Sequence, residues 1–187
     1  IDVPHGEREW GLSGSGSDAC LLRAKQPLMP LAELPVAGLH NATNALAAGA
    51  LCHAIGIDDV AIAKALRAFK GLPHRVEKIE TIDGVTYYDD SKGTNVGSTV
   101  AALGGFVQPV VLIAGGDGKG QDFTPLREPV RQRARAVVLI GRDAPQIEKA
   151  LAGCGVPCIP ATDMDDAIGR AQASARSGDA VLLSPAC

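Results

Sequence analysis

The chain has 187 residues and a formal net charge of −3, with 46% hydrophobic but only 3% aromatic residues. Its acidic balance argues against a nucleic-acid partner, which would require a basic face, and no apolar run reaches the length of a membrane-spanning helix. Because no signal-peptide pattern opens the sequence either, we expect a cytoplasmic protein without a membrane partner, long enough for one domain and part of another.

The first 36 residues hold three short strand-like pieces separated by turn residues. The pieces lie at 9–12, 20–24 and 28–31, and a turn rich in Gly and Ser at 14–18 joins the first two. They predict a hairpin or meander, which is too small to be stable alone.

Two helices are predicted next, and a linker follows them. The segment 40–55 is rich in Ala and Leu, with apolar positions at helical spacing. Asp58 or Asp59 can cap a second helix. The Gly-Leu-Pro segment 71–73 then predicts a domain boundary. The expected domains are residues 1–71 and 72–187.

Strands alternate with helices from residue 76 to the end of the chain. Asp83-Gly84, between two β-type runs, is a hairpin signal. Further strands are predicted at 109–114, 136–140, 156–159 and 180–183, and helices at 94–104, 125–133, 144–152 and 164–175. Such alternation predicts an α/β fold with a Rossmann-like, mostly parallel, doubly wound sheet.

The five cysteines are odd in number and scattered along the sequence. None of them forms a CxxC pair, and no second ligand pair suggests a zinc site. We therefore expect reduced, mostly buried thiols and no metal site built from cysteine.

Acids and a lysine lie where a predicted strand ends and a helix begins, in the segment 88–98. Thr94 or Asn95 can cap that helix, because their side chains accept hydrogen bonds from the free amides of its first turn. In open α/β sheets, ligands bind outside the carboxyl ends of the strands, near helix N-termini that favour anions. We therefore select Asp90 and Lys92 as site residues; a solvated turn is the alternative interpretation.

Two further candidates follow strands of the same predicted sheet. Lys119 lies in a glycine-rich loop after the strand 109–114, and its charge suits a carboxylate or a phosphate. This loop is not a P-loop, because its spacing differs from G-x-x-x-x-G-K-[ST]. Ser184 follows the last strand, where a hydroxyl can bind a substrate carboxylate. In a parallel sheet both would lie at the same edge as Asp90.

Amide and guanidinium side chains stand on either side of the expected domain boundary. Asn41 and Asn44 are three residues apart, so both amides lie on one face of a helix's first turn and can read an adenine edge. Simple N-capping is the alternative, and for Asn41 alone we favour it. Arg75, next to His74, suits polyphosphate because its fork is planar and always charged; the alternative is a surface charge.

Taken together, these segments strongly resemble the ATP-dependent Mur ligases of bacterial cell-wall synthesis. The resemblance rests on GLHNATNALAA (38–48), GLPHR (71–75) and DSKGTN (90–95). Two more segments, LIAGGDGK (112–119) and LLSPAC (182–187), are similar to those of the family members that add D-glutamate. The resemblance covers essentially the whole chain, in order and with the family's spacing.

The resemblance implies a three-domain enzyme of which this chain is a fragment. Residues 1–71 would be the end of the central, P-loop-type ATPase domain, and residues 72–187 a C-terminal Rossmann-like ligase domain truncated at its end. The UDP-sugar domain, the P-loop and the Mg²⁺ ligands would lie upstream. We therefore expect this chain to be inactive by itself, and the parent enzyme to be a monomer.

An ATP-dependent, amide-forming reaction is implied by the same resemblance. ATP with Mg²⁺ would phosphorylate the L-alanine carboxylate of UDP-MurNAc-L-Ala, and the amine of D-glutamate would then attack the acyl phosphate. The residues implied on the ATP side are Asn41 and Asn44 at the adenine, Asp90 at the ribose, Arg75 at the ribose and phosphate, and His74 beside it. Those implied at the carboxylates of D-glutamate are Thr94, Lys119 and Ser184. Lys92 would line the same cleft, and it and His74 are the catalytic candidates.

Other interpretations stay open. Another amino-acid ligase of the family, or a folylpolyglutamate synthase, would share the fold, although the Asn-Pro-Arg-type loop of the diaminopimelate-adding members is absent from the sequence. A non-catalytic nucleotide-binding module is the alternative from another class. A Rossmann oxidoreductase is disfavoured because G-x-G-x-x-G is missing.

Overall fold

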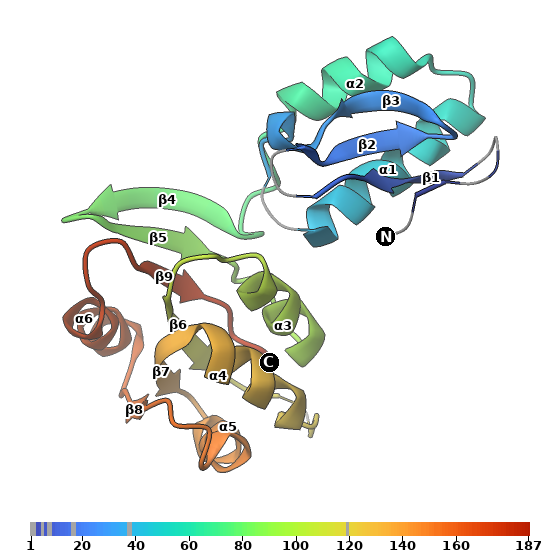
Figure 1. Ribbon diagram of the computed structural model, residues 1–187. Helices are drawn as coiled ribbons and strands as arrows, with labels where there is room; N and C mark the ends of the chain where they lie inside the picture. The colour runs from blue at the N-terminus through green and yellow to red at the C-terminus, as the bar shows by residue number, and fades with distance from the viewer. Residues whose placement is uncertain (1–2, 5, 7–8, 16–17, 37–38, 119) are drawn as a thin grey trace. The chain divides into compact units, whose positions relative to one another are not determined.

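The computed structural model of the chain describes residues 3–4, 6, 9–15, 18–36, 39–118 and 120–187. Two compact units divide the chain, residues 1–71 and residues 72–187, and each is described by itself (Figure 1). The change from one unit to the next falls within the Gly-Leu-Pro segment 71–73.

The first unit combines a three-stranded antiparallel meander with two helices. Its strands, which pair in sequence order, are β1 (Trp10–Ser13), β2 (Cys20–Arg23) and β3 (Gln26–Pro30). Its helices are the short η2 (Leu31–Glu33), α1 (Leu39–Ala54) and α2 (Asp59–Ala68). The first α-helix contacts β1, and the second contacts both α1 and β3. The predicted meander and helices are confirmed.

The core of this unit joins the sheet to α1. Leu21 and Met29 of the sheet pack in one buried cluster with Ala42, Ala45 and Leu46 of the helix. These helix positions are spaced as i, i+3 and i+4, which is the apolar stripe of an amphipathic helix. The burial of this stripe is what holds the short strands, which would be marginal alone.

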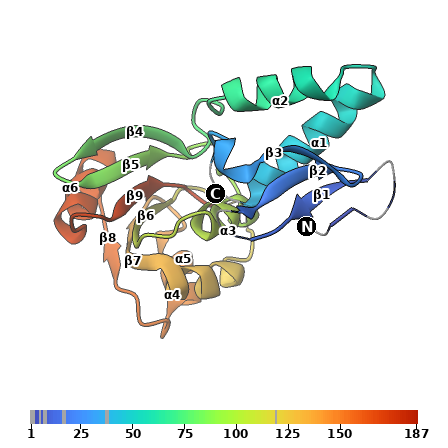
Figure 2. The same cartoon turned by 45° about the horizontal axis from the view of Figure 1, so that its top comes forward.

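The second unit is built on a six-stranded sheet in the order β4-β5-β9-β6-β7-β8. Its strands are β4 (Glu77–Ile82), β5 (Val85–Asp89), β6 (Val110–Gly115), β7 (Ala134–Ile140), β8 (Cys158–Pro160) and β9 (Ala180–Leu183). Only the hairpin of β4 and β5 is antiparallel, and the remaining pairs are parallel. Figure 2 shows β9 between β5 and β6, so the last strand lies inside the sheet. The predicted mostly parallel sheet is confirmed.

Helices cover both faces of this sheet. The helices of the unit are α3 (Val96–Gly104), η3 (Thr124–Leu126), α4 (Arg127–Arg133), α5 (Ala144–Leu151) and α6 (Met164–Ser174). Val110, Leu112 and Ala114 of β6 belong to the buried cluster that includes residues of α3, α4 and α5. Val111 and Ile113, which point the other way, belong to the cluster that includes residues of α6. This burial on both faces explains why β6 is a continuous apolar run.

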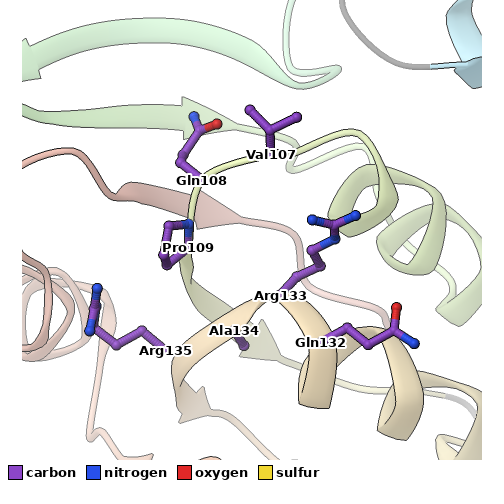
Figure 3. Close-up of a pocket in the computed structure, with 7 residues that line it drawn as sticks. All are labelled: Val107, Gln108, Pro109, Gln132, Arg133, Ala134 and Arg135. Atoms are coloured by element: carbon purple, nitrogen blue, oxygen red, sulfur yellow. The ribbon is translucent and has the colours of Figure 1, made fainter. Parts of the chain in front are cut away.

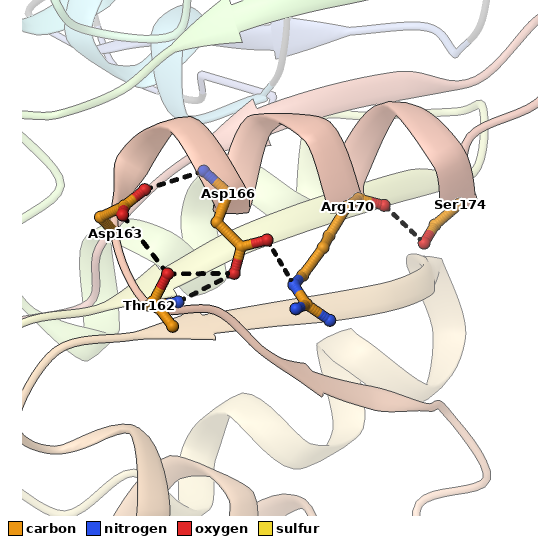
Figure 4. A network of polar contacts seen from close by, with 5 residues as sticks. All are labelled: Thr162, Asp163, Asp166, Arg170 and Ser174. Atoms are coloured by element: carbon orange, nitrogen blue, oxygen red, sulfur yellow. Dashed lines mark hydrogen bonds and ion pairs between the residues drawn. The ribbon is translucent and has the colours of Figure 1, made fainter.

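The start of α6 illustrates how local polar contacts fix the helix ends in this unit. Asp163, at the N-cap, accepts a hydrogen bond from the Asp166 amide at 2.9 Å (Figure 4). The Asp166 carboxylate in turn accepts from the Thr162 amide at 3.0 Å and from Arg170 Nε at 2.8 Å. These contacts satisfy backbone donors that a helix start leaves without partners.

The cysteines are all free, as expected, but the expectation that most are buried is wrong. Cys154 is buried, whereas Cys20, Cys52, Cys158 and Cys187 are partly exposed. Burial raises the pKa of Cys158 to about 11 and also raises that of Cys187, so both remain thiols at neutral pH.

Among the helices of the described ranges, none has the length and apolar character needed to cross a membrane.

Candidate active site

The carboxyl ends of β5, β9 and β6 bring candidate residues to one edge of the sheet. Leu183, the last residue of β9, is aligned with Asp89 of β5 on one side and with Ile113 of β6 on the other. Asp90 follows β5, Ser184 follows β9, and the glycine-rich loop follows β6. Three neighbouring strands therefore deliver their loops to the edge at which open α/β sheets bind ligands.

A buried chain of hydrogen bonds joins Asp90 to Ser184 and Thr99. Asp90 Oδ2 accepts from Ser184 Oγ at 2.7 Å, and the hydroxyl oxygens of Ser184 and Thr99 lie 2.8 Å apart. The exposed fractions of Asp90, Ser184 and Thr99 are 6%, 0% and 0%. An ionised carboxylate can only accept, so the Ser184 proton points to Asp90 and Thr99 donates to Ser184. Asp90 Oδ1 also accepts from the Val76 amide at 3.2 Å.

The sequence placed Asp90 and Ser184 at one edge, and the structure brings them into direct contact. Both hydrogen-bonding directions of the Ser184 hydroxyl are used inside the protein in this arrangement. Thr99 was missed by the sequence analysis. A threonine one turn into a mostly apolar helix, four positions after the cap residue Asn95, is the signal that could have found it.

Gly93 packs directly against this chain of side chains. A Cβ at this position would lie 2.5 Å from Asp90 Oδ2 and 2.6 Å from Ser184 Oγ. The Gly93 amide donates to the Asp90 carbonyl at 2.7 Å, and its carbonyl accepts from the Ala186 amide at 2.9 Å. Glycine is therefore required here because backbone and side chains approach closely.

The charge state of Asp90 is set by opposing influences. Burial raises the pKa of Asp90 above its ordinary value of 3.8, and the hydrogen bonds from Ser184 and Val76 lower it in part. The Asp89 charge raises this pKa and the Arg75 charge lowers it, so the exposed guanidinium of Arg75 acts electrostatically on the site. The Arg75 cation and the carboxylates of Asp89 and Asp90 therefore interact at this edge of the sheet. The cation predicted beside these acids was Lys92, and its role stays a prediction.

His74 lies in the turn that leads into β4. Its φ is 62°, which is unusual outside glycine. Its amide donates to Glu77 Oε2 at 2.9 Å, and its Nδ1 lies 2.6 Å from Asp89 Oδ2. Burial raises the pKa of Asp89, but hydrogen bonds from His74 and Ser91 outweigh it, so this pKa lies below 3.8. The predicted site residue His74 is thus paired with an acid next to Asp90.

His74, Glu77 and Asp89 also bring three ligand-type atoms within 4.8 Å of one another. Two ligands held at about 2.0–2.1 Å around a tetrahedral zinc ion would lie about 3.3 Å apart. The separation of 2.6 Å between His74 Nδ1 and Asp89 Oδ2 is shorter than that. At this distance His74 Nδ1 and Asp89 Oδ2 form a hydrogen bond, and their spacing is shorter than that of two zinc ligands.

Lys92 and Thr94 are exposed on the segment that leaves Asp90. The Lys92 amide donates to the His74 carbonyl at 3.2 Å, so these two candidates are joined through their backbones. Of the two predicted caps of α3, Asn95 is the one used, since its side chain accepts from the Ser98 amide at 2.9 Å. The Thr94 hydroxyl is therefore not needed for capping.

The glycine-rich loop after β6 is anchored near both of its ends. The Gly118 amide donates to Asp143 Oδ2 at 2.5 Å. Gln121 Oε1 accepts from the Val96 amide at 3.1 Å, and Gln121 Nε2 donates to the Ala186 carbonyl at 2.8 Å. Sequence reasoning selected neither anchor, although Asp143 lies three residues after the end of β7, at the carboxyl edge of the sheet. Lys119 itself lies outside the described residues, so its role stays a prediction.

Asn41 and Asn44 belong to the first unit, where they are neighbours on α1. Asn44 Nδ2 lies 3.5 Å from Asn41 Oδ1, so the two amides share one face of the helix. Asn44 is exposed and Asn41 is half-buried. The shared helix face agrees with the sequence prediction, and the adenine-reading role of the pair stays a prediction.

A hollow of about 260 Å³ lies at the opposite edge of the second unit's sheet (Figure 3). Its lining residues are Val107, Gln108, Pro109, Gln132, Arg133, Ala134 and Arg135. They precede or begin β6 and β7, so the hollow is at the amino ends of these strands. Because ligands of open α/β sheets bind at the carboxyl ends, the hollow is not the candidate substrate site.

A protein-family model matches most of the second unit of the chain. Residues 74–187 match the family described as "Mur ligase, glutamate ligase domain". The chain belongs to the Mur ligase family. The resemblance noted in the sequence is thereby confirmed.

Curated relatives of this Mur ligase chain are longer proteins. The UDP-N-acetylmuramoylalanine–D-glutamate ligase of Aromatoleum aromaticum is 60% identical over 187 residues, which are 99% of this chain and 40% of the relative. The ligase of the same name from Nitrosomonas eutropha is 55% identical over 187 residues, covering 100% of this chain and 40% of the relative. This Mur ligase chain therefore spans about 40% of the length of the relatives it matches.

Solved structures share the fold of this Mur ligase chain. MurF from Acinetobacter baumannii superposes with a TM-score of 0.67 at 20% identity, covering 93% of this chain and 40% of that one. The Mycobacterium tuberculosis folylpolyglutamate synthase complexed with ADP superposes with a TM-score of 0.68 at 17% identity, covering 94% and 44%. At these identities the likeness shows the fold alone.

Proposed function

We propose that this chain is part of an ATP-dependent ligase that adds D-glutamate to UDP-N-acetylmuramoyl-L-alanine in peptidoglycan precursor synthesis. The observation that carries the proposal is the identity of 60% over 187 residues to a ligase named for that reaction. The clustering of Asp90, Ser184 and the glycine-rich loop at one sheet edge supports it, because that edge is where such a fold binds its substrates.

Each unit, taken by itself, offers polar residues that suit a nucleotide. The adjacent amides of Asn41 and Asn44 offer donors and acceptors to an adenine, and Arg75 offers a cation to phosphates. Asp90 keeps lone pairs beyond those used by Ser184 and Val76, and with them it would accept from a ribose hydroxyl. ATP would supply the phosphoryl group that activates the L-alanine carboxylate.

We propose that Mg²⁺ accompanies ATP, because charge on a transferred phosphoryl group has to be neutralised. The described residues offer one set of three ligand-type groups, His74, Glu77 and Asp89, and two of these, His74 and Asp89, are hydrogen-bonded to each other. We therefore assign the metal ligands to other parts of the full-length protein.

The amino-acid side of the site would hold D-glutamate by its carboxylates. We assign this contact to Lys119 and to the exposed hydroxyl of Thr94. Ser184 would reach a carboxylate only if its hydroxyl turned away from Asp90; in the arrangement seen here it orients Asp90. Lys92, exposed beside His74, would neutralise charge that develops at the acyl phosphate. His74 would place Asp89 and the Lys92 backbone.

The remaining assignments follow from the same proposal. All partners would be small molecules, and the net charge of −3 fits the absence of a nucleic-acid partner. The enzyme would act as a monomer in the cytoplasm. Residues 1–71 would be the end of its central ATPase domain, and residues 72–187 part of its C-terminal ligase domain.

The proposal is tested by amino-acid selectivity in the full-length protein. Purified enzyme is incubated with ATP, Mg²⁺ and UDP-MurNAc-L-Ala, and with D-glutamate, L-glutamate or meso-diaminopimelate. We expect ADP, phosphate and a new amide with D-glutamate only. Ligation of another amino acid while D-glutamate is inert would overturn the substrate assignment. A separate arm with a reduced folate and L-glutamate tests the folylpolyglutamate synthase alternative.

The 187-residue chain alone is the second arm of this test. We expect it to form neither ADP nor product under the same conditions, because we assign the phosphate-binding loop to another part of the protein. Turnover by the chain alone would contradict that assignment.

A further inference from the structure

Residues 74–76 form a strained turn in the second unit, directly before β4. The φ values of His74 and Val76 are 62° and 50°, in the left-handed region. Val76 is β-branched, and such a residue is a genuine outlier in this region. Conformations of this kind persist only where the surrounding structure holds them, and they gather at ligand-binding sites. The turn is therefore expected to be held by specific contacts.

The backbone and the ring of His74 are all bound inside the second unit. The His74 amide donates to Glu77 Oε2 at 2.9 Å, and its carbonyl accepts from the Lys92 amide at 3.2 Å. Its ring Nδ1 lies 2.6 Å from Asp89 Oδ2. The pKa of Asp89 lies below its ordinary value, so this carboxylate is ionised at neutral pH and can only accept. The Nδ1 atom therefore carries the proton and donates it to Asp89.

Val76 is held by the residue that follows Asp89. The Val76 amide donates to Asp90 Oδ1 at 3.2 Å, and the Val76 side chain packs against the buried cluster that includes residues of β6 and α3. The neighbouring acids Asp89 and Asp90 thus fix the residues before and after Arg75. This arrangement explains why two left-handed residues are tolerated on either side of one arginine.

We infer that Asp89 is a positioning residue for Arg75, an inference that rests on the proposed function. The Arg75 side chain is exposed, and the Arg75 amide donates to the Leu72 carbonyl at 3.3 Å. Asp89 is itself held, because its Oδ1 accepts from the Ser91 amide at 2.8 Å. The direction in which the arginine leaves the turn is therefore set in advance. An arginine loses much rotamer freedom when it binds a phosphate, and a fixed starting point reduces the freedom that remains to be lost.

The charge of Asp89 gives this inference a sign that can be measured. A negative charge beside a phosphate site weakens the binding of an anion, since like charges repel. If Asp89 acted through its charge alone, its removal would tighten the binding of ATP. If Asp89 holds the turn that presents Arg75, its removal weakens that binding.

The test measures the dissociation constant of ATP with Mg²⁺ by calorimetry in the full-length protein, without the other substrates. Arg75→Ala should raise this constant by about tenfold to a hundredfold, as expected for the loss of one charge-assisted contact. Asp89→Ala should raise it by about threefold to tenfold, because Arg75 is misplaced and not removed. The KM for D-glutamate should change little in Asp89→Ala. Unchanged or tighter binding of ATP in Asp89→Ala, where Arg75→Ala weakens it, would overturn the inference.

A double variant separates positioning from a general loss of structure. In the Arg75→Ala background, Asp89→Ala should raise the dissociation constant no further, because the effects of two residues that act through one group are not additive. A further rise as large as in the wild-type background would show that Asp89 acts elsewhere, and would overturn the inference. An unchanged dissociation constant in Arg75→Ala would instead remove the proposed phosphate contact of Arg75, and the inference with it.

The conservative variant Asp89→Asn keeps the inference testable where Asp89→Ala does not fold. Its Oδ1 can accept from the Ser91 amide while its Nδ2 donates to a neutral His74 ring, so the affinity for ATP should stay near that of wild type. Binding as weak in Asp89→Asn as in Asp89→Ala would contradict the inference.

Asp166→Ala is the matched control in the same unit. The half-buried Asp166 carboxylate also accepts from a backbone amide and from a basic side chain, those of Thr162 and Arg170. It belongs to α6, which follows β8, and three strands separate β8 from β5 in the sheet. Asp166→Ala should therefore leave the dissociation constant of ATP unchanged. A rise equal to that in Asp89→Ala would show that loss of any such contact weakens binding, and would overturn the inference.

Discussion

Ser184 Oγ donates a hydrogen bond to Asp90 Oδ2 at 2.7 Å, although 94 residues separate the two in the sequence. The contact joins the ends of β5 and β9, which are parallel neighbours in the sheet. Both side chains are buried, and the hydroxyl of Thr99 extends the chain by one more hydrogen bond. A buried polar network of this kind stabilises a site only while every member keeps its partner.

Substitution of Ser184 by Ala should therefore destabilise the protein. The buried Asp90 carboxylate would lose a donor and Thr99 would lose its hydroxyl partner, which together cost about 1–3 kcal/mol. Urea denaturation measures the change in the free energy of unfolding. Ser177→Ala, at an exposed serine of the same unit, should change it by less than about 0.5 kcal/mol. Equal effects of the two substitutions would contradict the importance of the Asp90 contact.

Two glycines of the second unit should respond to alanine with opposite signs. Gly93→Ala places a Cβ 2.5 Å from Asp90 Oδ2, and overpacking of this kind destabilises by about 1–3 kcal/mol. Gly169 is exposed within α6, and a Cβ there meets nothing within 4 Å. Gly169→Ala should therefore stabilise by about 0.5–1 kcal/mol. Thermal denaturation of both variants decides the point; stabilisation by Gly93→Ala would show that the site relaxes freely.

The loss of stability at acid pH should depend in part on the protonation of Asp179. This buried carboxylate accepts from Arg135 Nη2 at 2.9 Å and from the Arg176 amide at 2.8 Å. The bonds from Arg135 hold the pKa of Asp179 below its ordinary value of 3.8, against the effect of burial. A carboxylate whose pKa is lower in the folded protein than in the unfolded protein stabilises the fold at pH values above the unfolded pKa. This stabilisation is lost as the pH falls through the folded pKa. In Asp179→Asn the loss of stability below about pH 4 should be shallower than in wild type.

Asp90 supplies the control for that experiment because its pKa is shifted in the opposite direction to that of Asp179. Its pKa is raised by burial, so its contribution is fully present below pH 3.8 and is lost as the pH rises through the folded value. In wild type, Asp90 should therefore make the free energy of unfolding decline as the pH rises, and Asp90→Asn should lack this decline. Unfolding by urea at a series of pH values from about 2.5 to 6 measures both slopes. The same change of slope in both variants would contradict the assignment.

The elements of this fold were predictable because their signals are local. The strand predicted at 180–183 has the bounds of β9, and the helix at 164–175 differs from α6 by one residue. Strand order is not local, yet the rule that ligands bind at the carboxyl edge sufficed to place Asp90 and Ser184 together. The element bounds and the shared edge could be predicted because hydrophobic periodicity and the direction of the strands can be inferred from a single sequence.

The supporting residues of the site could not be predicted in the same way. The contacts of Thr99, Gly93 and Asp143 depend on which strands are neighbours and on where a loop returns. Asp143 occupies the N-cap position of α5, and its contact with the Gly118 amide is decided by tertiary packing. The partial exposure of four cysteines was not predicted for a related reason. Cysteine is an apolar residue, but its residue type does not show which face of a helix or strand it occupies.

Lys119→Ala should raise the KM for D-glutamate much more than the KM for ATP in the full-length enzyme. Loss of a charge-assisted contact to a carboxylate costs about 1.5–3 kcal/mol, which is about tenfold to a hundredfold in affinity. Lys149→Ala, at an exposed lysine of α5, is the matched control and should leave both constants unchanged. A large ATP effect with an unchanged D-glutamate KM would be evidence against the assignment.

Asp90→Ala should weaken ATP binding if the carboxylate contacts the ribose. The loss of one hydrogen bond to a charged group corresponds to about a tenfold rise in the KM for ATP. Because binding energy from the nucleotide helps to place the reacting groups, kcat should fall as well. Asp90→Asn should be milder, since an amide oxygen can still accept from a hydroxyl.

The structural role of Asp90 has to be separated from this effect, and Ser184→Ala does so. That substitution removes the same internal hydrogen bond but leaves the carboxylate in place. At a temperature where all variants are folded, the KM for ATP should therefore rise in Asp90→Ala and stay near wild type in Ser184→Ala. Steady-state kinetics with ATP and D-glutamate varied separately make the comparison. Equal KM values for ATP in both variants would limit Asp90 to its contacts with Ser184 and Val76, and would remove its proposed contact with the ribose.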